Sequence, residues 1–237
     1  LGYSALVLVH DGNVFFSWGD VDKNLPCHSI RKPFLSALYG IYVGNKTIDL
    51  DLTMEKLGID DIAPNLTATE KQVTIRELLQ ARSGIYHEAA AEADPMKAAR
   101  PERGSHKPGE YFYYNNWDFN VLGTIFRQLT RKDIFQEFKE RIADPIGMQD
   151  FDVSNCAYEY EREKSEHPKY AFRMSARDMA RFGALYQKGG VWEGKRIIPE
   201  GWIKESTTTY SVTDSTLGAG FCYMWGTIIE GSRMSNL

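Results

Sequence analysis

The sequence has few of the features that mark specialised protein classes. Its 237 residues include three cysteines, Cys27, Cys156 and Cys222, whose spacing matches no metal-binding pattern and whose odd number leaves at least one thiol unpaired. No apolar run approaches the length of a membrane span, and the first residues do not resemble a signal peptide. Lysine and arginine form no basic cluster and the net charge is −4, which gives no reason to expect a nucleic acid partner. With 43% hydrophobic and 25% charged residues, the composition is that of a globular protein with a sizeable core.

The most informative motif in the chain is the tetrapeptide Ser29-Ile30-Arg31-Lys32. On a helix, positions i and i+3 share a face, so the Ser29 hydroxyl and the Lys32 amine can meet. A serine hydroxyl is a poor nucleophile until a neighbour takes its proton, and a lysine can do so once its pKa is lowered. Helical spacing of apolar residues over 30–42, with Pro33 in the first turn, places Ser29 at a helix N-terminus. There the helix dipole favours negative charge that develops during a reaction.

The order of the predicted elements indicates an α+β fold. Two β-rich runs, 5–10 and 14–18, flank an Asp-Gly turn, and strand character returns over 220–229. Helical spacing fills the middle, over 116–130, 133–143 and 176–187, and a capping box at 74–77 opens a short helix that Gly84 can close. We expect an antiparallel sheet that is formed from both chain ends and flanked by helices, with a mainly helical insertion. The predicted lobes are residues 1–48 with 172–237 for the sheet and 49–171 for the helices, with the active site at their junction.

Four blocks of sequence resemble the penicillin-binding-protein-like serine hydrolases, which include class C β-lactamases, DD-peptidases and esterases. The first block, 28–34, matches the family's Ser-x-x-Lys motif. The second, 73–85, is similar to its Leu-Leu…Ser-Gly stretch, and the third, 107–123, to its Pro-Gly…Tyr-x-Asn…Leu-Gly block. The fourth, 175–183, resembles the helix that follows the family's helical lobe. The blocks occur in family order, and their joint occurrence is more specific than any one of them.

The resemblance implies a role for individual residues. Ser29 would be the acylated nucleophile, and its backbone N–H would be one oxyanion donor. Lys32 would be the proton acceptor or an electrostatic partner, and Tyr114 would move a proton between nucleophile, leaving group and water; which of the two is the general base stays open. Asn116 would point its amide at the substrate or at Lys32. The resemblance further implies a small-molecule ester, amide or β-lactam substrate, no metal and no organic cofactor, and it favours an exported or periplasmic location.

The sequence departs from the family pattern in one respect. A third motif, usually Lys or His followed by Thr or Ser and Gly, is absent after Tyr114, so the fold is expected to be truncated at its C-terminal end. An alternative from another class is a non-catalytic binding protein on the same fold, which the missing motif favours. A packing role for Tyr114, within the aromatic run 111–114, is a second alternative. His87 and His106 are interpreted as hydrogen-bonded loop histidines, because no third ligand at metal spacing accompanies them.

Overall fold

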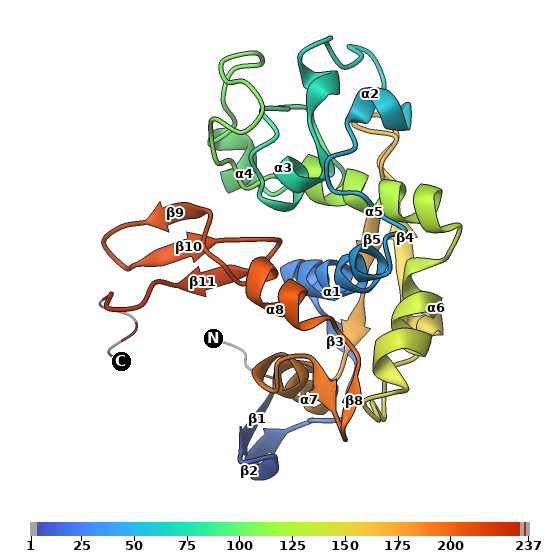
Figure 1. Cartoon of the computed structure of the whole chain (residues 1–237), viewed down its shortest axis with the longest axis vertical. Helices are drawn as coiled ribbons and strands as arrows, with labels where there is room; N and C mark the ends of the chain where they lie inside the picture. Colours follow the sequence, from blue (N-terminus) through green and yellow to red (C-terminus); the bar gives the residue numbers. More distant parts are fainter. Residues whose placement is uncertain (1–3, 233–234, 236–237) are drawn as a thin grey trace.

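The computed structural model of the chain describes residues 4–232 and residue 235 (Figure 1). The helices are α1 (Arg31–Gly44), α2 (Met54–Leu57), α3 (Ile75–Leu79), α4 (Asp94–Ala98), α5 (Asn116–Thr130), α6 (Ile134–Phe138), α7 (Ala176–Gln187) and α8 (Glu200–Ser206). The strands are β1 (Ala5–His10), β2 (Asn13–Gly19), β3 (Leu25–Pro26), β4 (Ala157–Glu159), β5 (Lys169–Ala171), β6 (Arg173–Met174), β7 (Val191–Trp192), β8 (Lys195–Arg196), β9 (Ser211–Asp214), β10 (Ala219–Phe221) and β11 (Gly226–Ile228). Within this part of the chain, no helix is long and apolar enough to cross a membrane.

The long helices α1 and α5 form the centre of the hydrophobic core. Phe34 and Leu38 on α1 and Phe119 and Leu122 on α5 are fully buried in one continuous cluster. The Tyr39 hydroxyl donates a hydrogen bond of 2.8 Å to the Leu122 carbonyl oxygen, which ties the two helices together. Burial of an apolar side chain of this size contributes about 1.5–3 kcal/mol to the free energy of unfolding. The apolar packing between α1 and α5 therefore holds α1 firmly in place.

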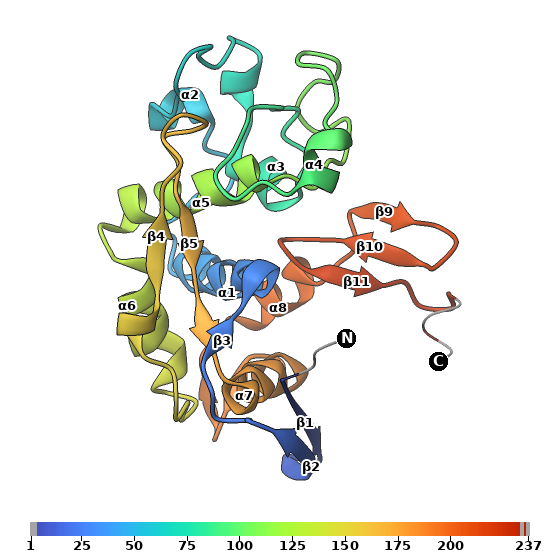
Figure 2. The same cartoon turned by 180° about the vertical axis from the view of Figure 1, so that it is seen from behind.

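Helix α8 packs across α1 through a close approach at a glycine. A Cβ atom built on Gly40 would lie 2.3 Å from the Trp202 ring, and Trp202 itself is buried. Figures 1 and 2 show α8 lying beside α1 from both sides of the molecule. Gly40 therefore permits the indole ring of α8 to sit directly on the α1 backbone.

The strands form small antiparallel sheets. They pair as β1–β2, as β11–β10–β9, as β3–β6, as β4–β5 and as β7–β8. The fold class expected from the sequence is confirmed, but the two chain ends form separate sheets in the described part of the chain rather than one. The β1–β2 hairpin hydrogen-bonds only within itself and packs on α7, apart from β9–β11 (Figures 1 and 2).

Most of the predicted local structure is confirmed. Helix α5 spans the predicted range 116–130, and Thr74 and Glu77 form the predicted reciprocal capping box. Two predictions were wrong in detail. Helix α3 ends at Leu79 rather than near Gly84, and the strand-prone run 220–229 divides into β10 and β11 around the turn 222–225. Gly84 instead serves a loop with φ 71°, where a Cβ would lie 2.8 Å from the His106 carbonyl oxygen.

Candidate functional site

Ser29 lies in a short 3-10 turn, His28–Ile30, directly before α1. His28 adopts a left-handed backbone conformation with φ 44°, which is uncommon for a residue other than glycine. The turn bends the chain so that Ser29 is exposed to solvent, while Lys32 lies in the first turn of α1. Strained backbone of this kind is typical of functional sites, where the surrounding fold holds a side chain in position.

Lys32 and Ser29 form a direct hydrogen bond. Lys32 Nζ lies 3.1 Å from Ser29 Oγ, although the Lys32 side chain is buried. The pKa of Lys32 is lowered from 10.5 to about 6, first by burial and then by the positive charges of Arg31 and Lys169. At neutral pH the amine is therefore largely unprotonated, the state in which it can accept a proton from the serine.

Tyr114 lies close to both Lys32 and Ser29. Lys32 Nζ is 4.8 Å from the centroid of the Tyr114 ring and 4.7 Å from that of Phe119. Burial raises the pKa of Tyr114, and hydrogen bonding with Ser29 and the charge of Arg31 oppose that rise. Tyr114 is therefore a phenol at neutral pH and can donate a proton. The centroid of its ring also lies 5.7 Å from that of Phe221. The Tyr114 side chain therefore packs against an aromatic neighbour and also lies close to Ser29.

The start of α5 orients Tyr114 and Asn116. Asn115, between them, caps the helix by accepting a hydrogen bond from the Asp118 backbone N–H at 2.9 Å. Asn116 is buried, and its amide nitrogen donates to the Ala91 carbonyl oxygen at 2.6 Å. Its side-chain oxygen is buried and has no described partner.

Two recessed regions meet at Ser29. One, the apolar groove, has a volume of about 610 Å³ and is lined by Phe112, Tyr114, Phe221, Met224 and Ile228 together with Ser29 and Lys32. The other, the cationic pocket, has a volume of about 250 Å³, and its polar lining residues are His28, Ser29, Arg31, Lys32, Asn116 and Lys169. The structure thus brings all four residues singled out from the sequence, Ser29, Lys32, Tyr114 and Asn116, to the lining of one of these regions or both.

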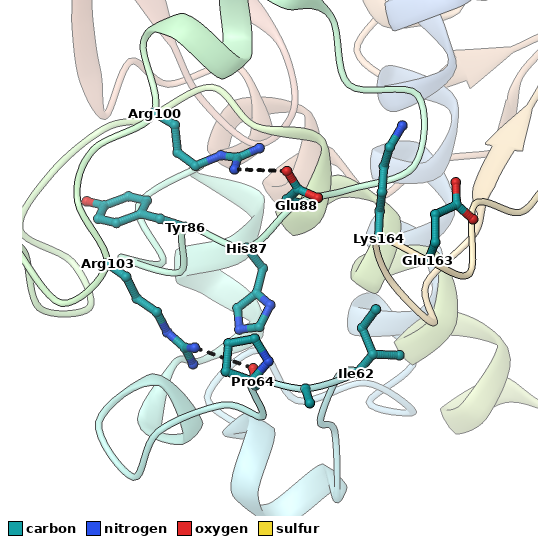
Figure 3. Close-up of a pocket in the computed structure, with 10 residues that line it drawn as sticks. Ile62, Pro64, Tyr86, His87, Glu88, Arg100, Arg103, Glu163 and Lys164 are labelled. Atoms are coloured by element: carbon teal, nitrogen blue, oxygen red, sulfur yellow. Dashed lines mark hydrogen bonds and ion pairs between the residues drawn. The ribbon is translucent and has the colours of Figure 1, made fainter.

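A separate cavity of about 260 Å³ lies away from Ser29 and is lined in part by Tyr86, His87, Arg100 and Arg103 (Figure 3). Its two arginines are already paired, Arg100 with Glu88 at 3.7 Å and Arg103 with Glu70 at 2.7 Å. In the described residues no group of three potential metal ligands comes together, here or elsewhere. This cavity has no nucleophile–base pair, so the region around Ser29 is the better candidate for chemistry.

Sequence reasoning did not identify Arg31 and Lys169 as part of the site. Arg31 was read only as a spacer within the tetrapeptide, and Lys169 lies on β5, far from it in the sequence. Arg31 is 2% exposed, and its guanidinium lies over the Tyr170 ring at 4.1 Å. The sequence does show an arginine inside the Ser-x-x-Lys motif, directly before the lysine. That this arginine is buried could not be known from the sequence.

Side chains of the remaining sequence blocks anchor loops to the starts of two helices. Ser83 Oγ donates a 2.6 Å hydrogen bond to Asp118 on α5. Asp178 at the start of α7 accepts hydrogen bonds from the backbone N–H groups of Gln149, Asp150 and Phe151. Ser83, Asp118 and Asp178 thus have a structural role, because they anchor loops to helix N-termini.

Comparison with known proteins places this arrangement in a family. The family model described as Beta-lactamase matches residues 1–233. Among curated proteins, Protein flp of Staphylococcus aureus (strain MW2) is 24% identical over 194 residues, covering 72% of this chain and 38% of that protein. A D-aminopeptidase of Brucella anthropi is 26% identical over 172 residues, covering 61% of this chain and 31% of that protein. The chain thus spans well under half the length of these relatives.

Solved structures show the same fold. A protein of Bacillus anthracis named as a 6-aminohexanoate-dimer hydrolase superposes with a TM-score of 0.71 at 22% identity, covering 94% of this chain and 64% of that one. A penicillin-binding protein from Bacillus halodurans gives 0.70 at 14% identity, covering 96% and 81%. The family model covers nearly the whole chain, and these structures share its fold. The chain therefore belongs to the beta-lactamase family, the group of penicillin-binding-protein-like serine hydrolases.

Proposed function

We propose that this protein is a serine hydrolase that cleaves an ester, amide or β-lactam carbonyl through an acyl-enzyme on Ser29. The observation that carries the proposal is the 3.1 Å hydrogen bond between Ser29 Oγ and the amine of Lys32, whose pKa is lowered to about 6. A hydroxyl in contact with an unprotonated amine is an activated nucleophile. Membership of the beta-lactamase family and the hydrolase names of its relatives support the same reaction class.

In the proposed mechanism, Lys32 accepts the Ser29 proton as Oγ attacks the substrate carbonyl. The new C–O bond leaves negative charge on the carbonyl oxygen, and the Ser29 backbone N–H donates a hydrogen bond to it, an effect often worth about 3 kcal/mol. Tyr114, as a phenol with a raised pKa, relays a proton to the leaving group while the scissile bond breaks. Water then attacks the acyl-enzyme with the same groups acting in the reverse sense, which returns the proton to Ser29.

The lining of the site supports a role for both recessed regions in substrate binding. The apolar groove would take the uncharged part of a substrate against Phe112, Phe221 and Ile228. Asn116, which lines the cationic pocket and has an unpartnered buried oxygen, would accept a hydrogen bond from a substrate N–H group. In this arrangement the scissile carbonyl lies between them, over Ser29 and Lys32.

The experiment that tests the proposal is intact-protein mass spectrometry after incubation with a fluorophosphonate and, separately, with a penicillin. A one-to-one adduct is expected in the wild type and no adduct in Ser29→Ala. Ser36→Ala provides the matched control, because Ser36 lies on the same helix but lines neither the apolar groove nor the cationic pocket. An adduct that persists in Ser29→Ala, or a folded wild type that reacts with neither reagent, would remove Ser29 from the mechanism.

A further inference from the structure

The cavity of about 260 Å³ in Figure 3, here named the His87 cavity, has no role in the proposed reaction. It lies in the part of the fold that surrounds α5, and residues from four separate segments of the chain line it. The lining residues used in the argument are Ile62, Pro64, His87, Glu88, Glu163 and Lys164. A volume of this size has room for a ligand of about ten non-hydrogen atoms.

Asp61 fixes two walls of this cavity in place. Its Oδ1 atom accepts hydrogen bonds from the backbone N–H groups of Ile62, at 2.8 Å, and Glu166, at 2.7 Å. Its Oδ2 atom accepts one from the indole N–H of Trp117 on α5 at 2.6 Å. One buried carboxylate thus joins the segment at 62–64 and the loop at 163–166 to the same helix. The cavity is therefore formed before any ligand arrives, which lowers the entropic cost of binding.

His87 gives the cavity a buried polar group that lacks a partner. The residue is 9% exposed, and among the described residues its Nε2 atom is buried without a hydrogen-bond partner. Burial lowers the pKa of His87, the charge of Arg103 acts in the same direction, and nearby carboxylates oppose the shift less strongly. The imidazole is therefore neutral at neutral pH, and a neutral imidazole has one acceptor nitrogen. A ligand with an N–H group can supply the donor that this acceptor needs.

The cations that line the cavity are already neutralised. Each of them forms an ion pair with a carboxylate that lies outside the lining. The pairs are Arg100 with Glu92, Arg103 with Glu70 and Lys164 with Glu161. An anionic ligand would therefore meet no uncompensated positive charge here.

Two carboxylates that line the cavity remain in excess. The one described ion pair of Glu88 is its 3.7 Å contact with Arg100, which is already neutralised. Glu163 is exposed and forms no ion pair within the part of the chain that the structure describes. The pKa of Lys164 is raised, first by its hydrogen bond with Glu161 and then, against some loss of solvation, by the charges of Glu163 and Glu88. Both surplus charges thus lie close to the same side chain, and their field favours a cation.

We propose that the His87 cavity binds a small organic cation, an ammonium group carried on an apolar body. The ammonium lies among Glu88, Glu163 and the imidazole of His87, and its N–H groups donate charge-assisted hydrogen bonds to them. The apolar body lies against Ile62 and Pro64. A metal ion is a poorer fit, because the described residues bring together no group of three potential metal ligands. The site is separate from Ser29, so the inference does not depend on the proposed hydrolase activity.

Three ligands of one shape test the importance of charge. Cyclohexylmethylammonium, cyclohexylmethanol and cyclohexanecarboxylate share an apolar ring and differ in the charge of the head group. Isothermal titration calorimetry with the whole chain should show that the ammonium binds in the millimolar range, as expected for a fragment of this size. It should bind about tenfold more tightly than the alcohol, the effect of one charge-assisted hydrogen bond. The carboxylate should bind more weakly than the alcohol.

Substitutions in the lining locate the binding. Glu88→Gln combined with Glu163→Gln removes both surplus charges and keeps the side-chain shapes, so it should abolish the preference for the ammonium over the alcohol. His87→Phe removes the acceptor nitrogen and should weaken ammonium binding about fivefold. Glu166→Gln is the matched control, because Glu166 is an exposed glutamate on the same loop that does not line the cavity. It should leave all three affinities unchanged.

The melting temperature of each ligand-free variant shows whether the fold is kept. The two glutamates are on the surface, so their replacement should leave it unchanged even if His87→Phe, at a buried position, lowers it. An ammonium that does not bind to the folded wild type, or an alcohol or carboxylate that binds as tightly, would overturn the proposal. An ammonium preference that survives the paired glutamate substitutions would do so as well, because the cation would then bind elsewhere.

Discussion

The guanidinium of Arg31 lies 4.1 Å from the centroid of the Tyr170 ring. Arg31 is the residue directly before Lys32 in the chain. Stacking on an aromatic face holds the arginine charge in the interior, where it acts on the lysine next to it. Burial lowers the pKa of Lys32 most, and Arg31 and then Lys169 lower it further. Because of this packing, Lys32 is unprotonated near neutral pH and can act as a base.

The first prediction concerns the pH dependence of activity. Because Lys32 must be unprotonated to accept the Ser29 proton, kcat/KM for a neutral ester should rise with pH and reach half its plateau near pH 6. Lys169→Met removes a repelling positive charge, so this acid limb should move to higher pH. A profile in which the limb stays in place in Lys169→Met, or shows no ionisation between pH 5 and 8, would contradict Lys32 as the base. Lys195→Met is the control, because Lys195 is exposed and lines neither recessed region.

The second prediction concerns stability. The pKa of Lys32 is lowered from 10.5 in the unfolded chain to about 6 in the folded state. Between these values the unfolded state binds the extra proton, so this group makes the free energy of unfolding rise with pH by about 1.4 kcal/mol per unit. Lys32→Met, which fills a similar volume, should therefore raise the melting temperature at pH 7, and its advantage should shrink toward pH 10. An advantage that is independent of pH would show that packing, not protonation, is its cause.

The third prediction concerns Tyr114. Removal of its hydroxyl in Tyr114→Phe leaves the ring contacts with Phe119 and Phe221 in place but removes the proton donor. Acylation or deacylation should slow by about 100-fold or more, with little change in melting temperature. Tyr111→Phe is the matched control, because Tyr111 is exposed and stacks on His106. A change below about twofold in Tyr114→Phe would exclude the hydroxyl from proton transfer and leave the ring with a packing role.

The fourth prediction compares two helical glycines. Gly40→Ala places a methyl group 2.3 Å from the Trp202 ring, so α8 must shift, and a loss of about 1–3 kcal/mol in the free energy of unfolding is expected. Gly183 on α7 has no atom within 4 Å of the corresponding position. Gly183→Ala should therefore stabilise the protein by about 0.5–1 kcal/mol through helix propensity. Chemical denaturation of both variants measures the difference, and equal effects would show that the α1–α8 contact is not close-packed.

Helices were the part of the fold that the sequence predicted best. The periodic apolar positions of α1 and α5 depend only on local spacing, and Thr74 with Glu77 makes a cap within one turn. The end of α3 was misplaced because Gly84 has a loop role that depends on the distant His106 backbone. The separation of the two terminal sheets was missed for a related reason. Strand pairing is decided by contacts between segments far apart in the sequence, which alternation of side chains does not specify.

The same contrast holds for the candidate site. Ser29 and Lys32 are three residues apart, so their hydrogen bond follows from helical geometry alone. Tyr114 and Asn116 were reached only through resemblance to a family, since nothing local to them indicates a neighbouring lysine. Lys169 comes from β5, and its position beside Arg31 depends on the packing of that strand against α5. The positive charge of the pocket therefore became visible only in three dimensions.

The cap that Asn115 provides has a consequence for how this segment can vary. Tyr114 and Asn116 reach the two recessed regions from opposite sides of one capping residue, whose own side chain is occupied by the Asp118 backbone N–H. Each residue added at this point would turn the following helix by about 100° relative to the cap. A single insertion or deletion there would carry Asn116 away from Ser29 while leaving the helix intact. Length at this junction is therefore as strictly constrained as residue identity, and homologous chains should align across it without gaps.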